Sequence, residues 1–244
     1  MSDQPEQPNP FRSRRFVLSM VVVGVIVLCA VIVIISNLAG GKNNADPTPS
    51  SSSAPPSTTA ATDPDPSVCG LKGYETTGTV DAPPPAKWLL VGTVAAPTDP
   101  KTIGPGVTAS DGLRTCFAHT PTGALYAASN VVAMGSDATL RKDVAEKLIV
   151  PGPGRDAAIA SANTGNDSAT VRYQIAGYKV LSYDGKTAKV DIAVNSSTGQ
   201  LVSFVWSLQW TDGDWKFVVT DDGASPNAPA PLTSLGGYTP WSGA

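Results

Sequence analysis

His119 is the only histidine in this chain of 244 residues, and acid–base chemistry is what its imidazole could supply. One histidine cannot build a multi-histidine metal site, although it could serve as a general base. No nucleophile motif and no clear partner accompany His119, which stands beside an expected helix start. We therefore interpret His119 as structural or exposed, and the sequence predicts no catalytic residue and no enzyme activity.

Two acidic clusters, in residues 212–214 and 221–222, are the candidates for a metal site. Their spacing matches no calcium-binding loop, and turns favour Asp for conformational reasons. The glycines of residues 152–154 precede a helical stretch, but the proline between them and the missing Lys and Ser/Thr exclude a phosphate-binding loop. The sequence thus predicts neither a metal nor a cofactor.

Aromatic residues are the candidates for contact surfaces. Three tryptophans could form a binding platform, but their alternation along expected strands indicates that they mostly fill the core: Trp206, Trp210 and Trp215. Tyr178 and Val180 are expected on the opposite face of their strand, and we predict that they belong to an interaction surface. Tyr238 and Trp241 of the C-terminal tail are further candidates for this surface and for pinning the tail to the domain.

The charge balance bears on the class of partner. The chain has 20 acidic and 17 basic residues, which gives a net charge of -3. A nucleic-acid binder would show a basic patch or stripe. We therefore expect no direct contact with nucleic acid.

Residues 16–35 form an apolar run without a charge, long enough as a helix to span roughly 30 Å, the hydrocarbon thickness of a bilayer. We predict a transmembrane helix over residues 16–38 in contact with membrane lipid. The alternative, a cleaved signal peptide, usually has a shorter apolar stretch of about 7–15 residues. Three arginines precede the run, so the positive-inside rule places residues 1–15 in the cytoplasm and the rest outside the cell membrane.

A linker is expected over residues 39–67. Residues 42–67 contain six Pro, six Ser and four Thr, and no aromatic or large aliphatic side chain. Such a composition cannot bury enough apolar surface to offset the entropy lost on ordering. The sequence predicts a disordered stalk that lifts the folded part away from the membrane.

The first part of the exported domain, residues 68–119, looks loosely structured, with one clear strand candidate over residues 87–94. It holds Cys69 and Cys116, which we expect to be oxidised outside the membrane. A bridge would close a loop of about 47 residues and contribute roughly 4 kcal/mol in the chain-entropy model. Two unpaired thiols are the alternative.

Helical spacing begins at Thr120, which can cap a helix that ends at Gly135. Asp137 caps a second expected helix, and a third, weaker helical segment covers residues 155–163. We expect these helices to pack on the apolar face of the sheet that the following residues predict.

The hydrophobic period changes from 3.6 to 2 after residue 163, which predicts four antiparallel strands separated by turns at residues 184–185, 195–199 and 212–213. The fold class is therefore α+β, with helices packed on a curved antiparallel meander over residues 120–222. The remaining residues, 223–244, are rich in Pro, Ser and Gly and are expected to form an extended tail.

The order of these parts resembles the bitopic assembly subunits of type IV secretion systems. The likeness lies in residues 173–219, ending in SFVWSLQWTDGDWKFV, because a Trp…Asp-Gly-Asp-Trp-Lys hairpin is common in the last strands of their exported domains. The tail sequence Gly-Tyr-Thr-Pro-Trp is similar to exported proteins of actinobacterial mobile elements. The resemblance implies a sheet of the cystatin or nuclear-transport-factor-2-like kind.

The resemblance also implies a function: a non-catalytic, membrane-anchored assembly subunit of a conjugative DNA-transfer or type IV secretion complex. Its partners would be other envelope subunits or copies of itself. Two alternatives stay open, an accessory subunit of another envelope complex such as lipid import, and an exported wall- or ligand-binding protein. An isomerase-like enzyme is the least favoured, because the expected pocket-facing residues are apolar: Val202, Phe204, Trp206 and Leu208.

Overall fold

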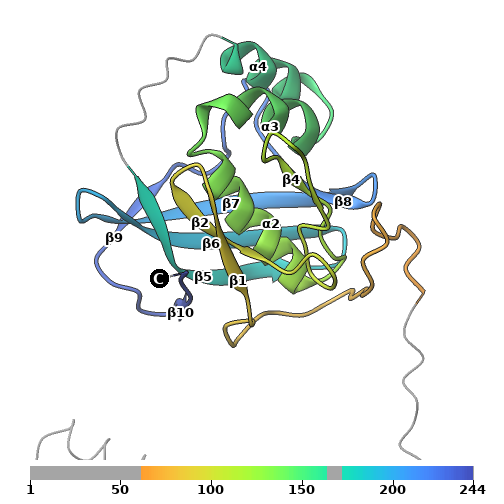
Figure 1. The fold of residues 1–244 in the computed structure, drawn as a ribbon, viewed down its shortest axis with the longest axis horizontal. Coiled ribbons are helices and arrows are strands. Elements are labelled where there is room, and N and C mark those ends of the chain that lie inside the picture. Colours follow the sequence, from red (N-terminus) through yellow and green to blue (C-terminus); the bar gives the residue numbers. More distant parts are fainter. Residues whose placement is uncertain (1–61, 164–171, 244) are drawn as a thin grey trace, which may run out of the picture. The chain divides into compact units, whose positions relative to one another are not determined.

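Four consecutive antiparallel strands build the main sheet of the computed structural model, which describes residues 62–163 and 172–243. They are neighbours in sequence order, as a meander requires: β5 (Tyr173–Tyr183), β6 (Thr187–Ser196), β7 (Leu201–Thr211) and β8 (Asp214–Phe217). With helices on one face of this sheet (Figure 1), the predicted α+β class is confirmed.

The turn between β5 and β6 is closed by Asp184, as the Asp-Gly signal predicts. Its carboxylate accepts hydrogen bonds from the N–H groups of Thr187 and Lys186, at 2.6 and 2.9 Å, and from the Thr187 hydroxyl at 2.9 Å. These bonds favour the charged form, and the two backbone donors contribute most to holding the pKa of Asp184 below its ordinary value.

We expect Asp184→Asn to remove part of the acid sensitivity of the domain. A carboxylate with a lowered folded-state pKa stabilises the fold fully above its unfolded value of about 3.9, and this contribution is lost as the pH falls through the folded-state pKa. The difference in thermal midpoint between the wild type and the variant should therefore be largest near neutral pH and shrink below about pH 4. A difference that stays constant down to about pH 2 would contradict this assignment.

Helix α2 (Pro121–Met134) packs on the sheet and is almost wholly buried (Figure 1). The predicted cap is present, because Thr120 Oγ1 accepts the N–H of Gly123 at 3.0 Å. A Cβ at Gly123 would collide with the carbonyl of Ala118, so the chain can enter the helix at this angle only with glycine there. The helix ends at Gly135, as predicted.

Residues 68–119 are more ordered than predicted. Residues 87–94 do not form one strand, because residues 92–93 turn the chain and make a hairpin of β1 (Lys87–Val91) and β2 (Val94–Thr98). The hairpin packs beside α2, and its strand β2 also contacts β5 of the main sheet (Figure 1). The prediction of a loose structure was wrong because this hairpin is stabilised by contact with a helix that follows much later in the chain.

The predicted disulfide joins Cys69 and Cys116, whose Cα atoms are 6.1 Å apart. Cys116 is fully buried and directly follows β4 (Arg114–Thr115), which pairs with β3 (Val107–Thr108). The bridge therefore fixes the segment that precedes the hairpin to the segment that leads into α2.

The second predicted helix begins with a 3-10 turn. Asp137 caps this turn, η2 (Ala138–Leu140), by accepting a backbone N–H at 2.9 Å, and α3 (Arg141–Leu148) continues from it. The third helical segment, expected over residues 155–163, is α4 (Pro153–Ala162). Both helices lie together at one end of α2 (Figure 1).

Both ends of the described chain pack onto the domain. The disorder predicted for residues 39–67 is wrong at its end, because Ser67 is buried and the N–H of Val68 donates to the carbonyl of Gly213 at 2.9 Å. The tail is extended, as predicted, and it also joins the sheet. Its strands are β9 (Ala230–Leu232), which pairs with β7, and β10 (Thr239–Pro240), which pairs with β5.

Within residues 62–163 and 172–243, no helix combines the length and the apolar character needed to cross a membrane. The predicted cytoplasmic end, residues 1–15, and the predicted transmembrane helix, residues 16–38, lie outside the described residues.

Candidate functional site

A cleft of about 320 Å³ lies where the end of α2, the turn of the β1–β2 hairpin and the strands β5 and β7 meet. Its walls are mainly apolar and aromatic, and the side chains that matter for the argument are Val131, Val132, Arg172, Tyr173, Phe204 and Trp206. Such a combination of apolar walls and a few polar groups is typical of ligand and peptide-side-chain sites.

The aromatic wall of the cleft is held by ring contacts. Tyr173 meets Phe204 edge-on with ring centroids 5.8 Å apart, and Trp206 meets Phe217 in the same way at 5.4 Å. The buried indole N–H of Trp206 has no acceptor among the described residues. An unpaired buried donor costs free energy, so this N–H is a polar group that the wall leaves unsatisfied.

The rim of the cleft carries Arg172, whose side chain is exposed. No carboxylate of the described residues lies within ion-pair distance of its guanidinium. Gln174 ties the start of β5 to the hairpin turn, because its side-chain amide donates to the carbonyl of Thr93 at 3.0 Å. The arrangement can bind a hydrophobic group with a carboxylate beside it.

The three tryptophans divide between core and cleft. Trp210 and Trp215 are 8% and 1% exposed, which confirms that they fill the core. Trp206 is half-buried and lines the cleft, so for this residue the core interpretation holds only in part.

His119 is buried, 3% exposed, and its ring lies flat on Trp210 with centroids 3.8 Å apart. Its Nδ1 lies 3.0 Å from the carboxylate of Asp63, and its Nε2 is hydrogen-bonded to the carbonyl of Gly185. Of the two predicted alternatives for His119, structural or exposed, the exposed one is wrong, because the ring is buried. The prediction that His119 has no clear partner was wrong. Its partner, Asp63, lies 56 residues earlier in the chain, in the predicted linker.

We expect His119→Ala to lower the free energy of unfolding by about 2–3 kcal/mol, because the change removes the ring stack and both hydrogen bonds. The milder variant Asp63→Asn keeps a side-chain oxygen as an acceptor and should cost about 1 kcal/mol. Urea unfolding followed by tryptophan fluorescence measures both changes. Equal losses in the two variants would show that neither the stack on Trp210 nor the bond to Gly185 contributes to stability.

Asp214 is the buried acid that sequence reasoning placed in a simple turn. It is 5% exposed, and its carboxylate accepts the N–H groups of Cys116, Phe117 and Trp215 at 2.6, 2.9 and 2.8 Å. Burial raises the pKa of Asp214, and the three backbone donors act in the opposite direction. Its role is to fix the segment before α2 against the hairpin of β7 and β8.

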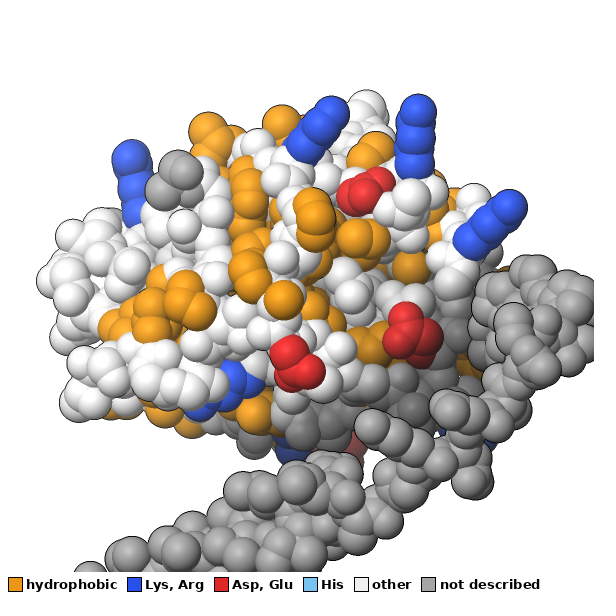
Figure 2. Space-filling model, turned by 90° about the horizontal axis from the view of Figure 1, so that it is seen from below, with side chains coloured by type: hydrophobic (Ala, Val, Ile, Leu, Met, Phe, Trp, Pro, Cys, Tyr) orange, Lys and Arg blue, Asp and Glu red, His pale blue; other side chains and the backbone are white. Residues whose placement is uncertain are grey.

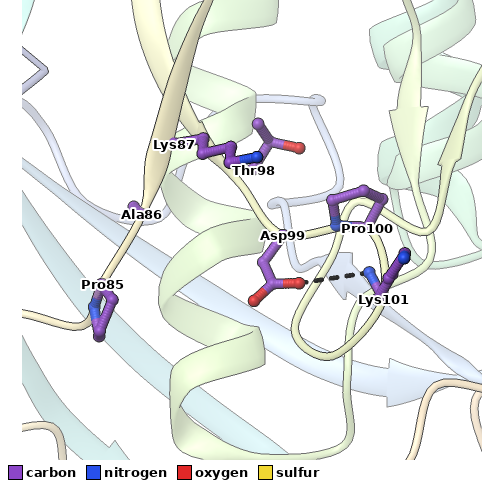
Figure 3. A pocket seen from close by; sticks show the side chains of 7 residues that line it. All are labelled: Pro85, Ala86, Lys87, Thr98, Asp99, Pro100 and Lys101. Carbon is purple, nitrogen blue, oxygen red and sulfur yellow. Dashed lines mark hydrogen bonds between the residues drawn. The ribbon is translucent and has the colours of Figure 1, made fainter.

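A second, more open pocket of about 470 Å³ lies beside the open end of the β1–β2 hairpin (Figure 3). Asp99 is its one lining carboxylate, and it accepts hydrogen bonds from the Thr102 hydroxyl at 2.6 Å and from the N–H of Lys101 at 3.3 Å. The Thr102 hydroxyl contributes most to lowering the pKa of Asp99. Because Asp99 is occupied with its own loop, this pocket is less suited than the cleft to holding a ligand in one orientation.

Two of the four residues predicted for an interaction surface are not exposed in the structure. Tyr178 and Trp241 are 0% and 6% exposed. A β-bulge between Ile175 and Gly177 adds one residue to β5, which turns Tyr178 to the buried face. Val180, also in β5, is half-buried.

The tail is pinned to the domain by Tyr238 and Trp241, as predicted. The Tyr238 hydroxyl donates to the buried carboxylate of Asp191 at 2.6 Å, and Lys179 lies 3.8 Å above the Tyr238 ring. Ser203 donates to the second oxygen of Asp191. These bonds hold the tail segment around Tyr238 against the face of the sheet opposite α2.

Among the residues that the structure describes, no three His, Cys, Asp or Glu side chains gather as metal ligands would. The acidic clusters at residues 212–214 and 221–222 are included in that range.

The cleft, the disulfide and the buried His119 all lie inside a matched family range. Residues 48–240 match the family described as Domain of unknown function (DUF8175). No curated protein and no solved structure matches the chain. Because the match spans well over half of the 244 residues, the chain belongs to this family, Domain of unknown function (DUF8175).

Proposed function

We propose that this protein is a non-catalytic, membrane-anchored assembly subunit of an envelope complex of the conjugative DNA-transfer or type IV secretion kind. Its exported domain binds a neighbouring subunit through the cleft. The observation that carries the proposal is the apolar, aromatic cleft with one guanidinium at its rim, since this combination suits the side chains of a protein partner.

The arrangement of elements supports a nuclear-transport-factor-2-like fold as the finer assignment. In that fold a curved antiparallel meander wraps helices and leaves an opening between helix and sheet. Here α2 lies on the sheet of β5 to β8, and the cleft opens at the end of α2. The β1–β2 hairpin and the disulfide are additions to that plan.

Binding is favoured over catalysis because the groups with catalytic potential are engaged elsewhere. His119 is stacked on Trp210 and hydrogen-bonded at both ring nitrogens, and Asp214 accepts three backbone N–H groups. Neither residue lines the cleft.

Site-specific photocrosslinking in whole cells tests the proposal. A photoreactive residue in place of Val132, which is half-buried in the cleft wall, should trap another envelope protein of the transfer machinery. The matched control is the same substitution at Lys189, an exposed residue of β6. The proposal fails if Val132 yields only the monomer, or if both positions trap the same proteins with equal yield.

A subunit of a lipid-import complex is the second candidate, and the apolar cleft with Arg172 at its rim favours it over other envelope roles. An acyl chain would lie on the apolar walls and its headgroup anion would pair with the guanidinium. Mass spectrometry of lipid that copurifies with the wild type but not with Arg172→Gln would support this candidate. The genes beside this one separate the two roles as well.

A further inference from the structure

A proline-rich strap, residues 81–86, crosses three buried aromatic side chains. Its backbone carbonyls accept one hydrogen bond from each ring, and the pairs are Tyr178 Oη with Ala82 O (2.8 Å), Trp241 Nε1 with Pro84 O (3.1 Å), and Tyr126 Oη with Pro85 O (2.9 Å). Three donors from three different elements thus follow the course of one extended segment.

The rings of Tyr126, Tyr178 and Trp241 lie together under the strap, and we call the surface that they would present without it the aromatic groove. Its members come from α2, β5 and the C-terminal tail, and Trp241 lies 5.6 Å from Tyr126 and 5.4 Å from Tyr178 between ring centroids. All three side chains are buried. Burial raises the pKa of Tyr178 to about 12, so its hydroxyl keeps the proton that it donates.

The strap lies on the outside of this groove. Ala82, Pro83 and Pro85 are exposed, and Pro84 and Ala86 are half-buried. The strap runs along the lower side of the domain in Figure 1, and Figure 2 shows that side from below, with hydrophobic side chains, prolines included, in surface patches. The rings of the aromatic groove are therefore buried, and the strap that covers them is itself largely exposed to solvent.

Aromatic rings that each carry one hydrogen-bond donor are suited to binding proline-rich segments. A proline-rich backbone lacks most N–H donors and presents its carbonyls outward, so a surface recognises it with aromatic rings that each carry one hydrogen-bond donor. We propose that the aromatic groove is a polyproline-recognition site, held in cis by the strap, which accepts a proline-rich segment of a partner protein when the strap lifts.

The structure itself argues for this occupant, because a segment of the same chemistry sits in the groove. The strap lies within the loop closed by Cys69 and Cys116, so it stays tethered when it leaves the rings. Space for an incoming segment exists at one end, since Pro85 and Ala86 line the open pocket of Figure 3. The tethered strap competes at a high effective concentration, and it should therefore weaken binding of any segment in trans.

The test uses the full-length chain in detergent micelles and a fluorescein-labelled peptide with the sequence of residues 79–87 (TVDAPPPAK). A triple variant, Pro83→Gly with Pro84→Gly and Pro85→Gly, frees the strap backbone and leaves the groove intact. Fluorescence anisotropy should show the peptide binding this variant about 10-fold more tightly than it binds the wild type. A peptide with alanine in place of its three prolines should not bind.

Two controls separate groove binding from general loosening. Pro226→Gly with Pro229→Gly changes two exposed prolines outside the strap and should leave the peptide affinity as in the wild type. Adding Tyr126→Phe to the triple variant removes one donor and keeps the ring, and it should weaken peptide binding about 5-fold.

A measurement on the wild type covers the case in which the triple variant does not fold. In the NMR spectrum, the indole N–H signal of Trp241 should move when the peptide is added at millimolar concentration, while that of Trp215, which donates to the buried carbonyl of Ala118, should stay in place. The proposal is overturned if the Trp241 signal does not move, or if the alanine peptide binds the triple variant as well as the proline peptide does.

Discussion

Asp214→Ala should lower the free energy of unfolding by about 3–5 kcal/mol, because it leaves three buried backbone N–H groups without an acceptor. The donors belong to Cys116, Phe117 and Trp215, so one carboxylate joins the segment before α2 to the β7–β8 hairpin. Each lost hydrogen bond carries the desolvation penalty of its donor, since Cys116, Phe117 and Trp215 are all buried.

Urea unfolding followed by tryptophan fluorescence measures this change. Asp214→Asn keeps one side-chain oxygen and should cost less than the alanine variant, and Asp221→Ala, at an exposed position, should stay within about 0.5 kcal/mol of the wild type. A loss below about 1 kcal/mol for Asp214→Ala would mean that the three bonds contribute little net stability.

The second large effect is expected from the disulfide. Replacing Cys69 and Cys116 with serine should lower the free energy of unfolding by about 4 kcal/mol, because the closed loop spans 47 residues and the cross-link restricts the unfolded chain. The same loss should follow reduction of the wild type with dithiothreitol. The third cysteine, Cys29, stays in place in the double variant, so any difference comes from the bridge.

Thermal unfolding with and without reductant distinguishes this effect from a packing defect. The wild type should fall to the midpoint of the double variant on reduction, and the double variant should not respond to reductant at all. A wild type that keeps its midpoint after complete reduction would show that the bridge does not stabilise the fold.

The sequence predicted those elements whose stabilising contacts are local. The cap at Thr120 acts over three residues, the turn at Asp184 acts over three residues, and the strands β6 and β7 show their alternation directly. The β1–β2 hairpin and the packing of residues 62–67 were missed, because their contacts reach across the chain. The bond between Asp63 and His119 is an example, with a separation of 56 residues.

The face assignment of Tyr178 failed for a different reason. Alternation predicts the face of a residue only while the register is unbroken, and the bulge between Ile175 and Gly177 shifts it by one. No signal in the residue types reveals that shift. The burial of Asp214 could not be predicted either, because an Asp-Gly-Asp sequence is equally compatible with a turn in which both carboxylates are exposed.

The cleft and the aromatic groove could not be predicted from one sequence, because each collects residues from elements that only the fold brings together. Val132, Tyr173 and Trp206 come from three separate elements, and Tyr126, Tyr178 and Trp241 come from a helix, a strand and the C-terminal tail. Their individual patterns indicate only buried or half-buried positions.

The fastening of residues 62–69 determines how the domain would carry mechanical tension. A pull on the chain ahead of residue 62 acts first on the Asp63–His119 contact, next on the bonds of Asp65 to Trp210 and of Val68 to Gly213, and then on the bridge at Cys69, which is a covalent link to Cys116. The load passes from Cys116 directly into the start of α2 at the centre of the core. Residues 70–115, with the hairpin and the strap, lie in the covalent loop beside this path and bear none of it.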